Sequence, residues 1–171
     1  VFLDLAPVAL DTPEDPIGAA REFIRIADEK GVEVHRNSCL GVDPASSRWR
    51  GAGAKDLSLA VEAANLAHAR GFRGVLVDAT VAHEQGAPEV QELAWSMMVA
   101  GTYPRALTEA GMSVDDAANQ LEFRYAATDN QFLTIAKIRA ARALWNQVAE
   151  LSGVSEASRA QHQHVVTSRP M

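Results

Sequence analysis

Two histidines separated by one residue, His162 and His164, form the arrangement in this chain that most directly invites a metal-binding interpretation. Residues i and i+2 share one face of a strand, so both rings would project to the same side. Zinc sites usually add further Cys or His ligands, but Cys39 is the only cysteine and lies far away in the sequence. The lack of further Cys or His ligands therefore disfavours a metal site, and we expect His164 to be a packed or hydrogen-bonded core histidine.

The other candidates for catalysis are isolated in the sequence. Asp4 and Asp78 lie in apolar runs and could serve as strand-end carboxylates for acid–base chemistry, but nothing in the sequence pairs them. Ser38-Cys39 has no recognisable base beside it. Gly51-Ala52-Gly53 lacks the later glycine and lysine of a phosphate-binding loop. None of these groups defines a reaction by itself.

Strand-like runs alternate with amphipathic segments of helical length, which is typical of a parallel α/β fold. Asp15 and Pro16 predict a helix start, and Gly31 predicts its end. Ser113 predicts the N-cap of a shorter helix. The predicted strands span residues 1–5, 32–35, 74–79, 121–125 and 164–168. The longer predicted helices are 16–30, 54–70, 87–111 (interrupted near Gly101 and Pro104) and one that begins near 129.

This order of elements fits either a doubly wound sheet or part of a (β/α)8 barrel. A complete barrel typically takes about 250 residues, so a barrel in this 171-residue chain would be partial. In both folds, functional side chains gather at the carboxyl ends of the strands. The predicted strand ends lie near Pro7, Arg36, Thr80, Thr128 and Ser168.

Composition narrows the class of protein. Hydrophobic residues make up 47% of the chain, which is enough for a sizeable core, and no run approaches the roughly 20 apolar residues of a membrane span. The formal net charge of -6 argues against a nucleic-acid partner. A single cysteine fits a reducing cytoplasm. Because both ends fall in or near strand-like runs, we expect residues 1–171 to be a piece of a longer protein.

The clearest amphipathic helix, Asp129–Trp145, resembles the signature helix of the coenzyme-B12-dependent acyl-CoA mutases, above all methylmalonyl-CoA mutase. The resemblance implies a (β/α)8 substrate barrel and radical chemistry with adenosylcobalamin. Residues 1–171 would then be the central part of the substrate-barrel domain of a longer chain. We expect Lys137 and Arg139 to lay their stems on the core at the edges of this helix, with Arg142 pointing away. The predicted buried stripe consists of Phe132, Ala136, Ala140, Ala143, Leu144, Val148 and Leu151.

A second match is Glu84-Gln85-Gly86-Ala87, which is similar to a Glu-x-Gly-Ala motif of the mutases. In catalytic chains of the family, a Tyr-His pair stands just before this motif, where it promotes cobalt–carbon cleavage and hydrogen-bonds the substrate thioester. Here the same positions hold Thr80 and Val81. Threonine has no aromatic ring, and valine has no donor for the carbonyl. His83 is two positions further on and is not a simple replacement.

Two more positions depart from the catalytic pattern. Leu76 stands where a small serine lines the bore that admits coenzyme A, and His162 stands where an arginine helps to bind it. With Thr80 and Val81, these departures imply the small, non-catalytic subunit of a heterodimeric mutase. The implied partner is a large catalytic subunit that binds the acyl-CoA, with adenosylcobalamin in the assembled enzyme and none on this segment. The alternatives are a competent acyl-CoA mutase of another specificity and a pure scaffold protein.

Overall fold

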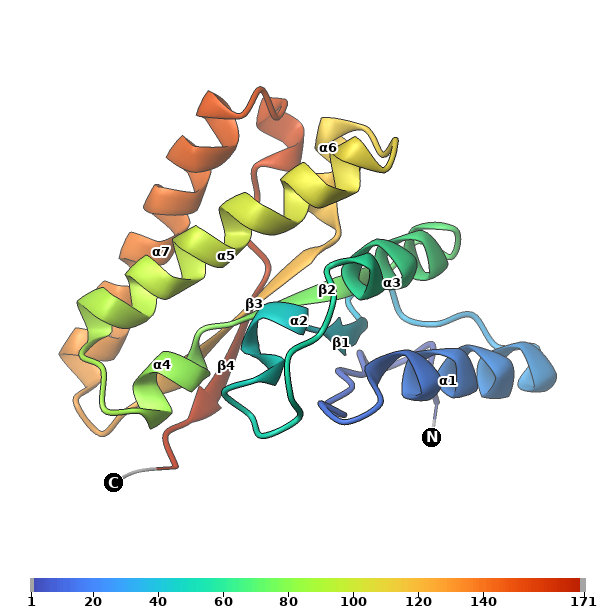
Figure 1. Cartoon of the computed structure of the whole chain (residues 1–171), viewed down its shortest axis with the longest axis horizontal. Helices are drawn as coiled ribbons and strands as arrows, with labels where there is room; N and C mark the ends of the chain where they lie inside the picture. The colour runs from blue at the N-terminus through green and yellow to red at the C-terminus, as the bar shows by residue number, and fades with distance from the viewer. Residues whose placement is uncertain (1, 170–171) are drawn as a thin grey trace. The chain divides into compact units, whose positions relative to one another are not determined.

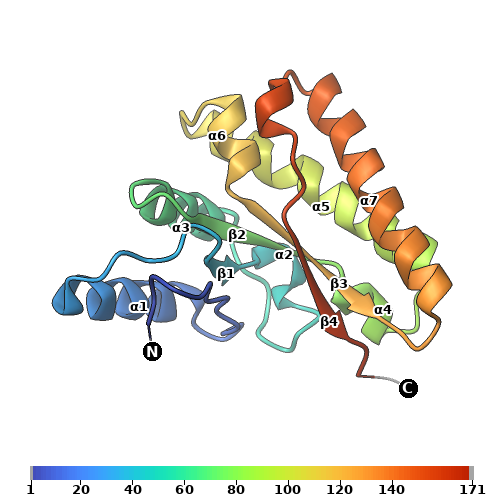
Figure 2. The same cartoon turned by 180° about the vertical axis from the view of Figure 1, so that it is seen from behind.

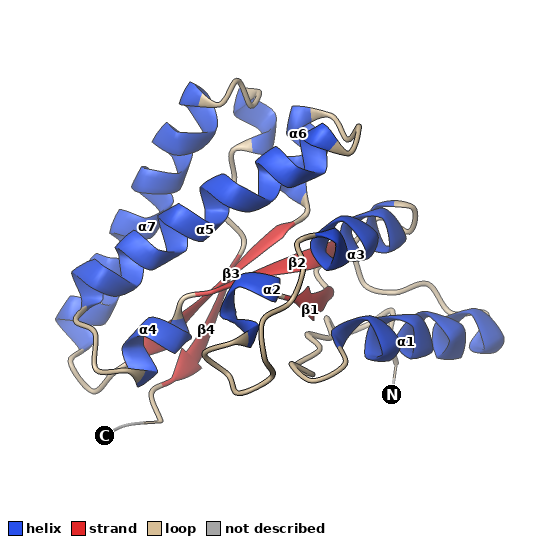
Figure 3. Ribbon diagram, viewed as in Figure 1, coloured by secondary structure: helices blue, strands red, loops and turns tan. Residues whose placement is uncertain are grey.

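A computed structural model describes residues 2–169 and shows an α/β chain in which four parallel strands alternate with helices (Figures 1 and 3). The predicted fold class is therefore confirmed. The chain divides into two compact units, Val1–Leu76 and Val77–Met171, with the boundary inside one strand.

The first unit contains one parallel strand pair and the helices beside it. It comprises α1 (Pro16–Lys30), β1 (Cys39–Val42), α2 (Pro44–Ser47), α3 (Ser58–His68) and the start of β2 (Arg73–Asp78). Cys39 pairs with Arg73, and Val42 pairs with Val75. The core joins α1, β1 and α3, and its buried members are Ile17, Ala20, Ile24, Leu40, Val42, Ala63, Ala67 and Phe72.

The second unit begins at the end of β2. It contains α4 (Thr80–Glu84), α5 (Glu89–Glu109), α6 (Val114–Asn119), β3 (Leu121–Ala127), α7 (Gln131–Leu151), a short 3-10 helix (Glu156–Ser158) and β4 (Gln163–Thr167). β3 and β4 pair in parallel without a bulge, from Phe123 with Gln163 to Ala127 with Thr167. α5 and α7 lie side by side, as both views show (Figures 1 and 2).

Local capping rules located several elements correctly. The side chain of Asp15 accepts a hydrogen bond from the Gly18 amide, and Gly31 ends α1 in the left-handed conformation at φ 60°. Ser113 caps α6 by accepting from the Asp116 amide. The predicted strands at 74–79, 121–125 and 164–168 correspond to β2, β3 and β4.

The two N-terminal strand predictions were wrong. Residues 3–5 form a turn, Ala9 makes only an isolated bridge to Cys39, and Val1 lies outside the described residues. Residues 32–35 are not a strand, and β1 lies in the segment 36–53 that had been predicted to be an irregular connection. Short apolar runs are ambiguous, and here the run whose side chains pack against α1 and α3 became the strand. Pro7 and Arg36 are consequently not strand ends.

The predicted interruption of the long helix is also absent. α5 runs from Glu89 to Glu109 through Gly101 and Pro104. Proline removes one backbone donor, but Tyr103 and Leu107 on either side are fully buried and hold the helix against its neighbours.

The face assignment of the signature helix was wrong as well. The buried residues of α7 are Lys137, Ala141, Trp145 and Ala149, spaced four apart. Phe132 is 86%, Leu144 41% and Leu151 82% exposed. α7 carries apolar residues on two sides, and the prediction from helical periodicity took the side with more large residues as the buried one. The structure buries the other side, where the ring of Trp145 lies 5.1 Å from that of Phe123 of β3 (centroid to centroid), tilted by 56°.

Candidate functional site

Within the second unit, the three predicted strand ends Thr80, Thr128 and Ser168 each follow the strand to which they were assigned. The amide of Ser168 donates to the carbonyl of Ala127 at 2.7 Å, so the ends of β4 and β3 are adjacent. Likewise, the amide of Ala79 donates to the carbonyl of Arg124 at 3.0 Å, which brings the end of β2 beside β3. The structure thus gathers these positions where parallel α/β folds bind ligands.

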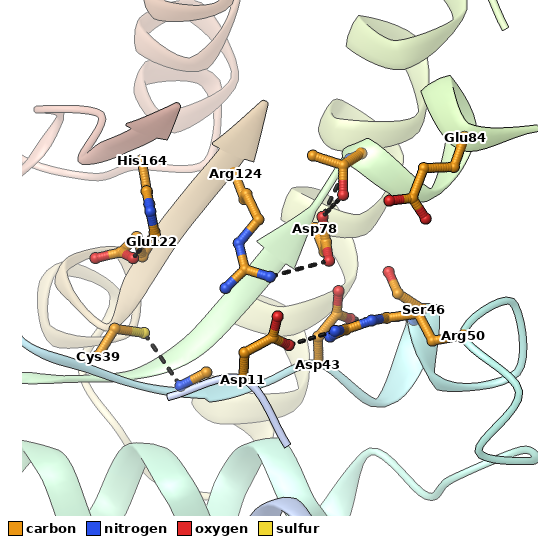
Figure 4. Close-up of polar contacts among 12 residues, drawn as sticks. Asp11, Cys39, Asp43, Ser46, Arg50, Asp78, Glu84, Glu122, Arg124 and His164 are labelled. Carbon is orange, nitrogen blue, oxygen red and sulfur yellow. Dashed lines mark hydrogen bonds and ion pairs between the residues drawn. The ribbon is translucent and has the colours of Figure 1, made fainter. Parts of the chain in front are cut away.

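The carboxylate of Asp78 is the centre of a buried polar cluster at the end of β2 (Figure 4). Its Oδ2 lies 3.5 Å from Nη1 of Arg124, and both side chains are almost fully buried. Its Oδ1 accepts hydrogen bonds from the Thr80 hydroxyl at 2.5 Å and from the Thr80 amide at 3.1 Å. Asp78 is therefore a paired, structural carboxylate. Arg124 was not singled out as its partner, because the two residues are 46 positions apart.

Thr80 and Val81, the first two residues of α4 after β2, are both buried. Thr80 is only 7% exposed and its hydroxyl hydrogen is donated to Asp78. Val81 is 3% exposed and has no polar side-chain atom. The Thr80 hydroxyl is therefore engaged within the fold, and Val81 contributes no side-chain hydrogen-bond donor.

A histidine–serine contact joins α4 to the residue after β4. Nε2 of His83 lies 2.7 Å from Oγ of Ser168, and Glu84 lies within 3.5 Å of Arg169. The sequence analysis noted that His83 is not a simple replacement for the missing catalytic residue, and it named Ser168 only as a strand end. The 85 residues between His83 and Ser168 explain why no local pattern could reveal the contact.

Of the two histidines, His164 lies in β4 and His162 lies immediately before it. Nδ1 of His164 lies 3.4 Å from Oε1 of Glu122, and the His164 side chain is 37% exposed, so it lies beside a carboxylate at the edge of the fold and not in the core as predicted. Figure 4 shows these two side chains meeting between β4 and β3. The carbonyl of His162 accepts the Phe123 amide. Over residues 2–169, no group of three or more His, Cys, Asp or Glu side chains is placed to hold a metal ion.

A second buried polar cluster in this unit joins α5, α7 and β3. Lys137 of α7 donates to Oε2 of Glu92 of α5 at 2.5 Å, and Oε1 of Glu92 accepts the Ala126 amide at 2.8 Å. The prediction that Lys137 ties neighbouring elements together is confirmed. Arg139 is exposed instead.

Tyr125 extends this network on the same side of β3. Its hydroxyl donates to the Ser96 hydroxyl at 3.0 Å and accepts from Gln161. Burial raises the pKa of Tyr125 to about 12; the nearby Glu92 charge also raises it, and the hydrogen bonds with Ser96 and Gln161 oppose the change. The network rigidifies the junction of α5, α7 and β3 and has no accessible reactive group.

The isolated candidates of the first unit have structural partners or lie on the surface. Ser38 accepts the Val8 amide at 3.0 Å, and Sγ of the buried Cys39 lies 3.8 Å from the Val75 carbonyl oxygen. Asp4 lies exposed in a turn, and the glycines of 51–53 have positive φ in a loop. Leu76 is fully buried in β2. Its direction toward a barrel axis stays a prediction.

Among the described residues, none of the helices combines the length and apolar character that crossing a membrane requires.

Comparison with known proteins now identifies the family. Residues 55–170 match the family described as Methylmalonyl-CoA mutase. Over its whole length the chain is 48% identical to "Methylmalonyl-CoA mutase small subunit" of Streptomyces virginiae and 38% identical to "Probable methylmalonyl-CoA mutase small subunit" of Mycobacterium tuberculosis; it spans 28% of each. Over 56% of its length it is 43% identical to 15% of "Methylmalonyl-CoA mutase small subunit" of Propionibacterium freudenreichii. The chain belongs to the methylmalonyl-CoA mutase family.

Proposed function

We propose that this chain is part of the substrate-barrel domain of the small subunit of a heterodimeric methylmalonyl-CoA mutase, and that the small subunit itself does not catalyse. The observation that carries the proposal is the pair after β2. The Thr80 hydroxyl is engaged with Asp78, and Val81 offers no donor. A chain without these groups lacks the means to polarise a thioester at this strand end.

The names of the relatives support a subunit role. Two full-length matches, at 48% and 38% identity, are to proteins named small subunit, and the chain spans only 28% of their length. A small subunit implies a large one, to which we assign acyl-CoA binding and the interconversion of methylmalonyl-CoA and succinyl-CoA. The single cysteine fits a reducing compartment, and we place the enzyme in the cytoplasm. No nucleic-acid or membrane partner is proposed.

Adenosylcobalamin is the cofactor that the family implies, and the residues at the strand ends do not fit it. The position of the tyrosine that promotes cobalt–carbon cleavage holds Thr80, which is buried and turned to Asp78. We therefore assign no cofactor to this segment, and adenosylcobalamin belongs to the assembled enzyme.

Two further positions support a chain that does not bind the coenzyme. Leu76 replaces a small residue of the bore, and its bulk would occupy space that pantetheine needs. His162 replaces an arginine, which removes a permanent positive charge from the coenzyme A site. Leu76 and His162 would each weaken binding by a separate mechanism, one steric and one electrostatic.

Isothermal calorimetry tests the proposal. The full-length small subunit and the large subunit are each titrated with methylmalonyl-CoA. We expect binding to the large subunit and binding at least 100-fold weaker to the small subunit. Micromolar binding to the small subunit alone would overturn the proposal. Turnover by the small subunit alone with adenosylcobalamin would instead support a competent mutase of another specificity.

A further inference from the structure

The short helix α4 lies across the carboxyl end of β3. It begins at Thr80, just after β2, and its last turn reaches the residue that follows β4, because Nε2 of His83 lies 2.7 Å from Oγ of Ser168. In the sheet, β3 is the strand between β2 and β4. A contact between the segments that follow β2 and β4 therefore passes the end of β3. Figures 1 and 3 show α4 beside the tip of β4.

The first turn of α4 is buried beside a charged pair. Thr80 and Val81 are 7% and 3% exposed, and the Thr80 hydroxyl donates to Asp78. Asp78 in turn lies 3.5 Å from Arg124, and both charged side chains are almost fully buried. They lie at strand ends, which is where parallel α/β folds bind ligands. α4 therefore helps to keep water and ligands away from this pair.

The second half of α4 is held less firmly. The residues from Glu84 to Gly86 are exposed, and a Cβ on Gly86 would meet no heavy atom within 4 Å. Among the described residues, two side-chain contacts hold this half: His83 with Ser168, and Glu84 with Arg169. The second contact is a surface ion pair, which contributes little. A five-residue helix has little stability of its own, so the position of this half depends mainly on His83.

The chemistry of the His83–Ser168 contact suits a latch. A serine hydroxyl both donates and accepts, so it can bond to Nε2 in either tautomer of the neutral ring and in the protonated ring. One such hydrogen bond changes an equilibrium constant by a factor of about two to ten. That is enough to favour a closed position of α4 without making it permanent.

We propose that α4 is a cover over the carboxyl end of β3, and that the His83–Ser168 hydrogen bond is the latch that holds the cover closed. Opening would expose the Asp78–Arg124 pair while the sheet stays intact. The inference rests on the proposed function and deepens it. A closed cover adds a further reason why acyl-CoA does not reach these strand ends in the small subunit.

Hydrogen exchange of the full-length small subunit, followed by mass spectrometry, measures how often α4 opens. Peptides that cover residues 80–86 are compared among wild type, His83→Ala, Ser168→Ala and the double variant. His68→Ala is the matched control, because His68 is an exposed histidine in the last turn of another helix, α3. Peptides from β3 report whether the sheet itself has loosened.

Each single variant is expected to raise the exchange of residues 80–86 about two- to tenfold. The double variant should exceed neither single variant, because both substitutions remove the same hydrogen bond. His68→Ala and the β3 peptides should match wild type. Unchanged exchange in Ser168→Ala would overturn the latch, as would multiplied effects in the double variant. An equal rise in β3 would show loosening of the whole sheet and would overturn the cover. None of these results alters the calorimetric test, so the proposed function can stand or fail separately.

Discussion

Nζ of Lys137 on α7 lies 2.5 Å from Oε2 of Glu92 on α5, and both side chains are at most 1% exposed. The other oxygen of Glu92 accepts the amide of Ala126 near the end of β3. One carboxylate thus joins two helices and a strand. Burying two charges is expensive, so such a pair is stable only while both partners and their hydrogen bonds are present.

Removing one partner should therefore be severe. Lys137→Met is expected to lower the free energy of unfolding by about 3–5 kcal/mol, because Glu92 would remain buried without a counter-ion. Denaturant melts of the full-length small subunit measure the change. Lys137→Met/Glu92→Leu should cost less than the two single substitutions added together. Additive losses would contradict direct coupling of the pair.

The corrected face of α7 makes opposite predictions for two neighbouring residues. Trp145→Ala should cost about 3–5 kcal/mol, because the indole is buried against Phe123. Leu144→Ala should cost less than about 1 kcal/mol in the isolated subunit, because its side chain is partly exposed. Arg142→Ala, also exposed, should change stability by less than about 0.5 kcal/mol. Equal losses for Trp145→Ala and Leu144→Ala would show that the outer side of α7 is buried in the intact chain.

Gly74 and Gly101 differ in whether a neighbouring segment leaves room for a Cβ atom, so alanine substitutions at the two positions can be compared. A Cβ on Gly74 of β2 would lie 2.3 Å from the Ala63 carbonyl oxygen of α3, so Gly74→Ala is expected to destabilise by about 1–3 kcal/mol or more. A Cβ on Gly101 of α5 would meet nothing within 4 Å, so Gly101→Ala should stabilise by about 0.5–1 kcal/mol through helix propensity. Thermal melts compare the two. A neutral Gly74→Ala would mean that α3 can move away from β2.

The raised pKa of Tyr125 predicts a loss of stability at high pH. The unfolded tyrosine ionises near pH 10, whereas burial keeps the folded one protonated up to its pKa of about 12. Between these values only the unfolded state loses the proton, so the free energy of unfolding falls as pH rises, by about 1.4 kcal/mol per pH unit. Below pH 10 the contribution is complete.

Denaturant melts from pH 8 to 11 measure the slope. Tyr125→Phe keeps the ring and removes the ionisable group, so its stability should fall less steeply above pH 10 than that of wild type. Parallel curves for the two proteins would show that Tyr125 ionises equally in both states.

Local chemistry in the sequence was sufficient for much of the fold. Asp15, Pro16 and Gly31 specify the ends of α1 through their own side chain, ring and backbone freedom, which need no distant partner. The apolar run at 74–79 is typical of a strand covered on both faces, and β2 is indeed buried at every position. The signature helix and the motif at 84–87 were enough to suggest the family, which the match over residues 55–170 then established.

Tertiary structure decided what depends on distant partners. Residues 39–42, and not 32–35, became β1 because Leu40 and Val42 find a core between α1 and α3. Trp145 packs against Phe123, and Lys137 pairs with Glu92. These contacts determine which face of α7 is buried. Asp78 with Arg124 and His83 with Ser168 are likewise far apart in sequence. A periodic pattern shows that a side chain can be buried, but the free energy that buries it comes from the surface it meets, and only the folded chain supplies that surface.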